Sequence, residues 1–146
     1  SSYSEPLYTM SNTSDQNLMR VIHYPPIRIS DHPDELRAAA HSDINLITLL
    51  VSGSQPGLQV KNNNGEWINI ESKKGQIVVN NGDMLQECSE GHYPSTIHRV
   101  INPEKKSNVS RFSIPLFIHP RPEVILSKRY TADSYLLERL KSLGLK

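Results

Sequence analysis

The sequence predicts an all-β core, an antiparallel sandwich or barrel, followed by one C-terminal helix. Short stretches of β-branched and apolar residues recur along the chain, and glycine, proline and asparagine separate them. Helical periodicity is absent between these stretches and becomes clear only after Tyr130. With 146 residues, of which 36% are hydrophobic and 21% are charged, the chain is expected to form a single globular domain.

Turn residues divide the predicted sheets into about seven strands. The first strand ends at Pro25-Pro26, and the Asn64-Gly65 step is a strong hairpin signal between two others. Asn81-Gly82-Asp83 closes a further strand, and Asn80 and Asp83 are interpreted as structural residues of that tight turn. The expected strands are residues 18–24, 45–50, 58–61, 67–70, 76–80, 95–101 and 111–118.

The end of the chain carries the signals of a helix from cap to stop. Thr131 is a suitable N-cap, and Gly144 can end the helix. We expect the apolar stripe between them to pack on the sheet, in preference to forming a dimerisation surface. The stripe consists of Leu136, Leu137, Leu140 and Leu143.

Net charge and apolar patterning limit the partners and the compartment. The formal net charge of +1 gives no support to a nucleic-acid or acidic-membrane role. No apolar run approaches the roughly 20 residues of a membrane span, and the first residues lack the features of a signal peptide. Cys88 is the single cysteine, so no internal disulfide framework exists. These features predict a cytoplasmic protein in which Cys88 is a small packing residue.

Two histidines and one aspartate carry the strongest chemical signal. His41 and Asp43 are two positions apart, so on a strand both side chains would point to the same face. Together with His98, they offer two neutral imidazoles and one carboxylate. Such a set can hold iron(II) on one face and leave about three positions open, as in non-haem iron oxygenases. A His-x-Asp pair alone is common by chance, so the metal-site hypothesis depends on the rest of the pattern.

A second pair of residues suits an acidic cosubstrate. Arg111 and Ser113 also lie two apart and so share a strand face. A guanidinium offers paired donors to a carboxylate, and the serine hydroxyl adds another hydrogen bond. Tyr24 can add its phenol to the same carboxylate. The plainer interpretation of an exposed strand arginine and a core aromatic stays open at this point.

Taken in their order along the chain, these motifs resemble the catalytic core of the iron(II)- and 2-oxoglutarate-dependent dioxygenases. The resemblance is to the branch of isopenicillin N synthase and of plant flavonoid and hormone oxygenases, and it runs from about Met19 to Leu143. Its landmarks are His23-Tyr24-Pro25-Pro26, His41-Ser42-Asp43, Ile47-Thr48-Leu49-Leu50, Gly57-Leu58-Gln59-Val60, Gly65-Glu66-Trp67-Ile68, Val79-Asn80-Asn81-Gly82-Asp83, Ser95-Thr96-Ile97-His98-Arg99-Val100 and Arg111-Phe112-Ser113.

The resemblance implies a double-stranded β-helix, a distorted jelly roll with the metal inside its mouth. Arg111 and Ser113 match the pair that holds the distal carboxylate of 2-oxoglutarate, and Tyr24 matches a tyrosine that often hydrogen-bonds this cosubstrate. No catalytic residue is expected beyond the metal ligands. The residues that match the family's iron ligands are His41, Asp43 and His98.

The implied reaction is the oxidation, usually the hydroxylation, of a small organic molecule by dioxygen. 2-Oxoglutarate would be converted to succinate and carbon dioxide, with ascorbate as a reductant. Two alternatives stay open: an iron-dependent oxidase of the isopenicillin N synthase type that does not use 2-oxoglutarate, and a jelly-roll binding module without activity. The oligomeric state is left open by the sequence.

Some positions depart from the family pattern or are assigned structural roles. Ile22 and Ile27 stand where the family often has asparagine and cysteine, which affects the finer cosubstrate contacts. Family members carry a further N-terminal region, so residues 1–146 are expected to be a single catalytic core from the C-terminal part of a longer chain. Trp67 is expected to be a sheet-packing anchor. Surface or local hydrogen-bonding roles are expected for His23, His32, His92 and His119.

Overall fold

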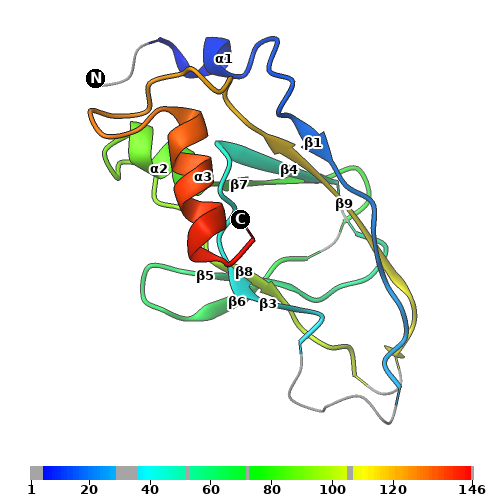
Figure 1. Ribbon diagram of the computed structural model, residues 1–146. Helices are drawn as coiled ribbons and strands as arrows, with labels where there is room; N and C mark the ends of the chain where they lie inside the picture. The colour runs from blue at the N-terminus through cyan, green and yellow to red at the C-terminus, as the bar shows by residue number, and fades with distance from the viewer. Residues whose placement is uncertain (1–4, 29–35, 52, 72, 105–106, 146) are drawn as a thin grey trace.

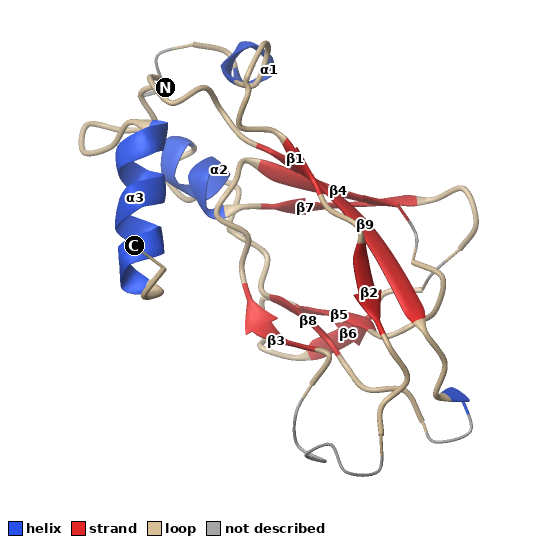
Figure 2. Ribbon diagram, turned by 45° about the vertical axis from the view of Figure 1, so that its right-hand side comes forward, coloured by secondary structure: helices blue, strands red, loops and turns tan. Residues whose placement is uncertain are grey.

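The computed structural model describes residues 5–28, 36–51, 53–71, 73–104 and 107–145. Within them two antiparallel sheets face each other, and the helices gather at one end of the pair (Figure 1, Figure 2). This is the double-stranded β-helix that the sequence predicts, with its C-terminal helix. The strands are β1 (Leu18–Met19), β2 (Ile22–Tyr24), β3 (Ala38–His41), β4 (Ile47–Val51), β5 (Leu58–Lys61), β6 (Trp67–Asn69), β7 (Ile77–Asn81), β8 (His98–Val100) and β9 (Arg111–Ile118).

The larger sheet is built around β9. Its strand order is β1-β9-β4-β7, and β2 pairs with the first part of β9 on the same side as β1. Side chains alternate along β9: Arg111 and Ser113 are buried against the second sheet, whereas Phe112 and Ile114 are exposed on the outer face. This period of two is the property that places the arginine and the serine on one inner face.

The expected strand at residues 18–24 is interrupted, and a proline explains the break. The register of β1 and β2 on β9 brings Arg20 opposite Pro115. Proline has no backbone N–H, so it cannot complete the ladder, although the N–H of Arg20 still donates to its carbonyl at 3.0 Å. The two short strands β1 and β2 result.

The smaller sheet has the strand order β3-β8-β5-β6. The Asn62–Glu66 turn joins β5 to β6 as the sequence predicts, with Gly65 at a φ of +83°. On β3, three steps from Ala38 to His41 oppose two steps from Val100 to His98, so the strand contains a bulge. The extra residue re-aims the strand, and both Ala38 and His41 therefore face the space between the sheets.

The helices enclose the main apolar core. They are α1 (Leu7–Met10), α2 (Asp83–Cys88) and α3 (Ala132–Ser142). The prediction of no helix between the strands is wrong for α2, which separates β7 from β8. Both α2 and α1, which precedes β1, are too short to show a periodic pattern. The core cluster that they enclose consists of Met10, Leu46, Met84, Leu85, Cys88, Val124, Leu126 and Ala132.

Helix α3 begins as predicted and packs differently from the expectation. Thr131 accepts a hydrogen bond from the N–H of Ser134, whose side chain accepts one in return, and Gly144 follows the helix at a φ of +71°. The helix packs through Ala132 and Leu136 on the cluster of α2 and its neighbours, whereas Leu143 is exposed. Figure 2 shows α3 beside α2, at the end of the two sheets and not on the face of either.

The outer face of the larger sheet is apolar. Val51 on β4 is the cross-strand neighbour of Ile77 on β7 and of Ile114 on β9, and Val79 lies two pairs further along, on the same face. Val51, Ile77 and Val79 are each more than half exposed. Among the described residues, no helix has the length and apolarity needed to cross a membrane.

Candidate active site

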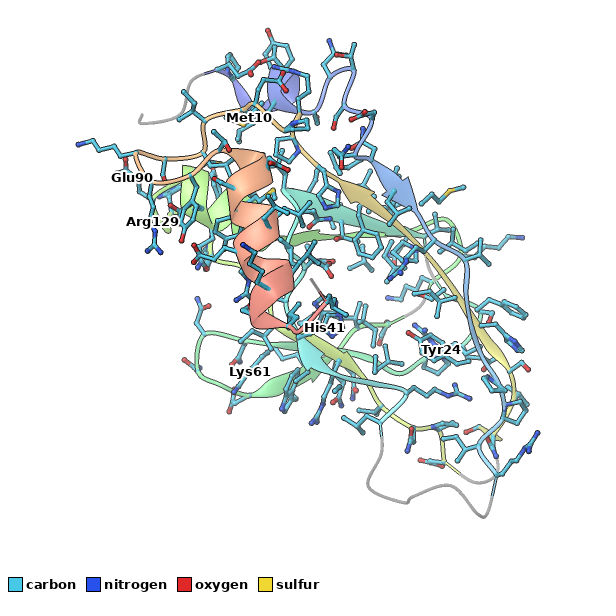
Figure 3. The ribbon with its side chains drawn as sticks, viewed as in Figure 1. Met10, Tyr24, His41, Lys61, Glu90 and Arg129 are labelled. Atoms are coloured by element: carbon cyan, nitrogen blue, oxygen red, sulfur yellow. The ribbon has the colours of Figure 1, made fainter. Side chains whose placement is uncertain are left out.

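A pocket opens between the two sheets, and every expected site residue lines it. Figure 3 shows Tyr24 and His41, which come from different sheets, directed into the space between them. The larger sheet and its connections contribute Ile22, Tyr24, Asp43, Thr48, Leu50, Val78, Asn80, Arg111, Ser113, Pro115 and Phe117. The smaller sheet contributes Ala38, His41, Leu58, Val60, His98 and Val100.

His41 and His98 face each other across β3 and β8. They are direct cross-strand partners, and their ring centroids lie 4.3 Å apart. Nδ1 of His41 lies 2.8 Å from the carbonyl of Ala39, and Nδ1 of His98 lies 3.0 Å from that of Thr96. Because a carbonyl only accepts, each Nδ1 carries the proton and donates it. Each Nε2 then keeps its lone pair for a metal ion.

Asp43 reaches the two histidines from a loop, and the expectation that it continues the strand of His41 is wrong. β3 ends at His41, and the following loop is fastened to the start of α2. The N–H of Asp83 donates to the carbonyl of Asp43 at 2.8 Å, and the N–H of Met84 donates to that of Ile44 at 3.2 Å. The free N–H groups of the first turn of α2 thus fix the loop that carries the carboxylate.

The two oxygens of Asp43 have different partners. Oδ2 accepts hydrogen bonds from Oγ1 of Thr48 at 2.5 Å and from Nδ2 of Asn80 at 2.9 Å. Oδ1 faces Nε2 of His41 at 3.9 Å and Nε2 of His98 at 3.8 Å. The sequence assigns Asn80 only to a turn, so its contact with the carboxylate corrects that interpretation. Thr48 and Asn80 are the residues of the site whose role the sequence reasoning missed.

The three side chains fit a metal ion. Their ligand atoms all lie within 4.8 Å of one another. The His–Asp separations of 3.8 and 3.9 Å are too long for hydrogen bonds, and they lie under the limit of about 4.2 Å for two atoms each about 2.1 Å from one ion. A small inward movement of the side chains would bring all three ligand atoms onto the same ion. Asp43 is buried, and the side chain of His41 is 49% exposed, so the site opens to solvent on the side of His41. Two neutral imidazoles and one carboxylate on one face suit iron(II).

Arg111 lies at the other end of the pocket and is only 2% exposed. Its Nε donates to the carbonyl of Gln55 at 3.1 Å, and no described residue is a hydrogen-bond partner of its buried Nη1. Burial lowers the pKa of the guanidinium from its ordinary value, and Tyr24 partly offsets this effect. A buried guanidinium with an unused donor favours an acidic ligand, because an unpaired buried donor is costly.

Ser113 and Tyr24 lie next to this guanidinium. Ser113 shares the inner face of β9 and is 6% exposed. Tyr24 is the direct cross-strand partner of Arg111, whose guanidinium lies 5.4 Å from the centre of the tyrosine ring. Arg111, Ser113 and Tyr24 therefore lie together as expected. Arg111 is not an exposed strand arginine, and Tyr24 lines the pocket beside it.

The remaining residues with assigned roles behave mainly as expected. His23 is exposed and lies 3.2 Å from Oγ of Ser110, and His92 is exposed beside Tyr93. Trp67 packs under the guanidinium of Arg99 at 4.1 Å, which confirms a packing role. His32 lies outside the described residues.

Cys88 is buried away from the pocket, and His119 is partly buried there. Cys88 is 1% exposed, and burial raises the pKa of its thiol to about 11, which confirms a packing role. The sequence assigns His119 to the surface or to local hydrogen bonding. In the structure it is partly buried, and burial lowers the pKa of its imidazole, an effect that the Phe117 carbonyl and Asp43 partly offset. It lines a small cavity beside Ala132 and Leu136 of α3.

The fold and the site together define a class of protein: a jelly-roll protein with a convergent His-Asp-His group, as in non-haem iron oxygenases. The family model of the 2OG-Fe(II) oxygenase superfamily matches residues 16–120. The chain belongs to this superfamily, whose metal is iron(II) and whose cosubstrate is 2-oxoglutarate.

Solved and sequenced relatives agree with this assignment. A crystallised protein from Shewanella oneidensis that is assigned as an oxygenase is 53% identical, with a TM-score of 0.88 over 99% of this chain and 54% of its own. A full-length Neurospora crassa protein, crystallised in complex with alpha-KG, is 32% identical, with a TM-score of 0.79 over 91% of this chain and 46% of its own. The 2-oxoglutarate-dependent dioxygenase citB of Monascus ruber is 40% identical over 102 residues, or 68% of this chain and 30% of its own length. The chain thus spans about half or less of the length of these relatives.

Proposed function

We propose that this chain is the catalytic core of an iron(II)- and 2-oxoglutarate-dependent dioxygenase that oxidises a small organic molecule. Dioxygen supplies one oxygen atom to the substrate, usually as a hydroxyl group, and the other to succinate as 2-oxoglutarate loses carbon dioxide. The observation that carries the proposal is the coexistence, in one pocket, of a convergent His-Asp-His group and a buried arginine with an unused donor.

In this proposal His41, Asp43 and His98 hold the iron ion. The support is that each histidine donates from Nδ1 to a backbone carbonyl, so both rings direct a lone pair from Nε2 toward Oδ1 of Asp43. Bound there, iron(II) would supply the site at which dioxygen is activated. The three protein ligands occupy one face, which leaves about three positions for the cosubstrate and dioxygen.

Arg111, Ser113 and Tyr24 bind the cosubstrate. The guanidinium pairs with the distal carboxylate of 2-oxoglutarate, to which the serine hydroxyl and the tyrosine phenol donate. The burial of Arg111 and Ser113 supports this role, because a water-poor site strengthens charge-assisted hydrogen bonds. Apolar side chains from both sheets, among them Leu50 and Val60, line the pocket between the two ends and limit the access of water.

We further propose that the enzyme belongs to the branch of isopenicillin N synthase and acts in the cytoplasm on a small molecule. Neither a nucleic acid nor a membrane is its partner. The net charge of +1 supports the exclusion of nucleic acid and membrane, and the single buried cysteine supports the cytoplasm. The oxygen-accepting substrate would approach from the side of His41, whose side chain is the most exposed of the three proposed ligands.

Residues 1–146 are, in this proposal, a single catalytic core from the C-terminal part of a longer chain. The relatives are about twice this length or more, and the outer face of the larger sheet exposes Val51, Ile77 and Val79. An apolar face of this kind is normally covered. The 146-residue chain alone should therefore self-associate in sedimentation velocity, and Val79→Lys should reduce this association. A chain that stays monomeric at high concentration would contradict the proposal.

Oxygen-dependent formation of succinate tests the activity. Purified protein receives iron(II), ascorbate and 2-oxoglutarate, alone and with a panel of small organic molecules, and the succinate formed is measured. Wild type should form succinate, and Asp43→Ala should form none. Iron-dependent oxygen uptake without succinate would instead identify an oxidase of the isopenicillin N synthase type. Binding of iron and 2-oxoglutarate without any turnover would identify a binding module.

A further inference from the structure

Hydrogen bonds from Thr48 and Asn80 hold only one of the two carboxylate oxygens of Asp43. We propose that Thr48 and Asn80 are positioning residues that reserve Oδ1 of Asp43 for the metal and keep the carboxylate a one-atom ligand. The inference rests on the proposed iron site and adds to it the pair of residues that sets how many positions on the ion stay open.

The geometry of the two donors supports this role. Thr48 on β4 and Asn80 on β7 are direct cross-strand partners, and both side chains point into the pocket. Both donate to the same atom, Oδ2 of Asp43, at 2.5 Å and 2.9 Å. A carboxylate oxygen with two good donors has little capacity left for a metal ion. The other oxygen, Oδ1, is the one that faces the two imidazoles.

A third residue fixes the direction of the threonine hydroxyl. Nδ2 of Asn45 donates to Oγ1 of Thr48 at 3.0 Å and to the carbonyl of Ile47 at 3.0 Å. Since Oγ1 accepts from Asn45, its own proton is free to go to Asp43. Asn45 is 1% exposed and is packed against Gly82 at the start of α2, so the relay from Asn45 to Thr48 to Asp43 is anchored to the backbone.

The number of positions left on the ion explains why one-atom binding matters. A carboxylate that binds through both oxygens occupies two positions, and with two imidazoles it leaves too few for a two-atom cosubstrate and dioxygen together. When Thr48 and Asn80 hold Oδ2, Asp43 binds the ion through Oδ1 alone. The carboxylate and the two imidazoles then occupy three positions on the ion and leave about three open. We therefore expect the loss of either donor to disorder the carboxylate, weaken metal binding and free Oδ2 to compete for a position that the cosubstrate needs.

Cobalt(II) provides the test, because it is stable in air and its visible spectrum reports the number and type of its ligands. Thr48→Val and Asn80→Leu remove one donor each with little change of shape. Thr48→Ser keeps the hydroxyl, and Asn81→Leu makes the same change on the next residue of β7, which points away from the pocket. Equilibrium dialysis gives the affinity for cobalt(II), and titration with 2-oxoglutarate follows on the loaded proteins.

Thr48→Val and Asn80→Leu should bind cobalt(II) about 10- to 100-fold more weakly than wild type, the usual effect of losing a partner of a metal ligand. Their cobalt(II) spectra should change, and their loaded forms should bind 2-oxoglutarate more weakly. Thr48→Ser and Asn81→Leu should resemble wild type in cobalt(II) affinity, in the cobalt(II) spectrum and in 2-oxoglutarate binding. Thermal unfolding of the metal-free proteins separates these effects from loss of the fold, and Asn80→Leu suffices if Thr48→Val does not fold.

Two results would count against the inference, and they differ from failure of the proposed function. Unchanged cobalt(II) affinity and spectra in both donor variants would overturn the positioning role while leaving the iron site intact. An equal loss in Thr48→Ser, which keeps the donor, would also overturn it, since the effect would then follow packing and not the hydrogen bond. If wild type itself bound no cobalt(II), the proposed iron site would fail before the inference was reached.

Discussion

His41 and His98 are direct cross-strand partners on β3 and β8, and their rings lie 4.3 Å apart at an interplanar angle of 54°. The bulge in β3 makes this pairing possible, because it turns His41 to the face that carries His98. Both rings donate from Nδ1 to the backbone, so neither needs a partner at Nε2 other than a metal ion. The protein should therefore be stabilised by metal.

We predict that iron(II), added without oxygen, or cobalt(II) raises the melting temperature of the protein. A ligand at 100 times its dissociation constant stabilises the native state by about 2.7 kcal/mol, provided that it does not bind the unfolded chain. His98→Ala and Asp43→Ala should abolish the increase, and chelation by EDTA should reverse it. His92→Ala, which changes an exposed histidine outside the pocket, is the control. An unchanged increase in His98→Ala would argue against the site.

Arg111 should determine the affinity for 2-oxoglutarate. Arg111→Leu should weaken binding to the metal-loaded protein by about 2 kcal/mol, or about 30-fold, because a charged pair of hydrogen bonds is lost. Isothermal titration calorimetry without oxygen measures the change. Arg20→Ala removes an exposed arginine from outside the pocket and should leave the affinity unchanged. Equal binding by wild type and Arg111→Leu would place the cosubstrate elsewhere.

Gly82 should be needed for the metal loop. A side-chain carbon at this position would collide with the carbonyl oxygen and Oδ1 of Asn45, the residue whose Nδ2 donates to Thr48. We predict that Gly82→Ala lowers the free energy of unfolding by about 1–3 kcal/mol and also weakens cobalt(II) binding. Urea denaturation and equilibrium dialysis measure the two effects. Gly75→Ala, at a φ of +84° but in open space, should lower stability only and leave metal binding as it was.

The metal site shows how far a sequence pattern can predict geometry. His41, Asp43 and His98 are predicted together and lie together, yet the strand alternation invoked for His41 and Asp43 is not the cause. The aspartate is placed by the backbone of α2 and by Thr48. Long-range hydrogen bonds of this kind leave no periodic trace in the sequence, so only the family pattern connected these residues.

Other differences have the same physical origin. The Asn80–Asp83 segment is predicted to be a tight turn, since asparagine, glycine and aspartate favour turns. It instead ends β7, supplies a donor to Asp43 and begins α2. In α3 the cap is readable because capping is local, whereas the exposure of Leu143 depends on where the helix lies against its neighbours. Local chemistry is visible in the sequence, and tertiary placement is not.

His119 should make stability depend on pH. Burial lowers the pKa of its imidazole below the ordinary value of 6.5, so the folded protein binds this proton less readily than the unfolded chain. The corresponding stability is present above pH 6.5 and is lost as the pH falls through the folded pKa. Urea denaturation of the metal-free protein between about pH 7.5 and about pH 5 should show a steeper loss for wild type than for His119→Gln. Parallel curves would contradict this assignment.

Binding of iron and of the keto acid at one centre tests the account most directly. Iron(II) and then 2-oxoglutarate are titrated into the protein without oxygen, and the visible spectrum is followed for the weak charge-transfer band of a keto acid chelated to iron(II). We predict a band that saturates at one equivalent of 2-oxoglutarate and is absent in Asp43→Ala. Bound iron without the band would contradict 2-oxoglutarate as the cosubstrate, and failure to bind iron would contradict the assignment of His41, Asp43 and His98 as its ligands.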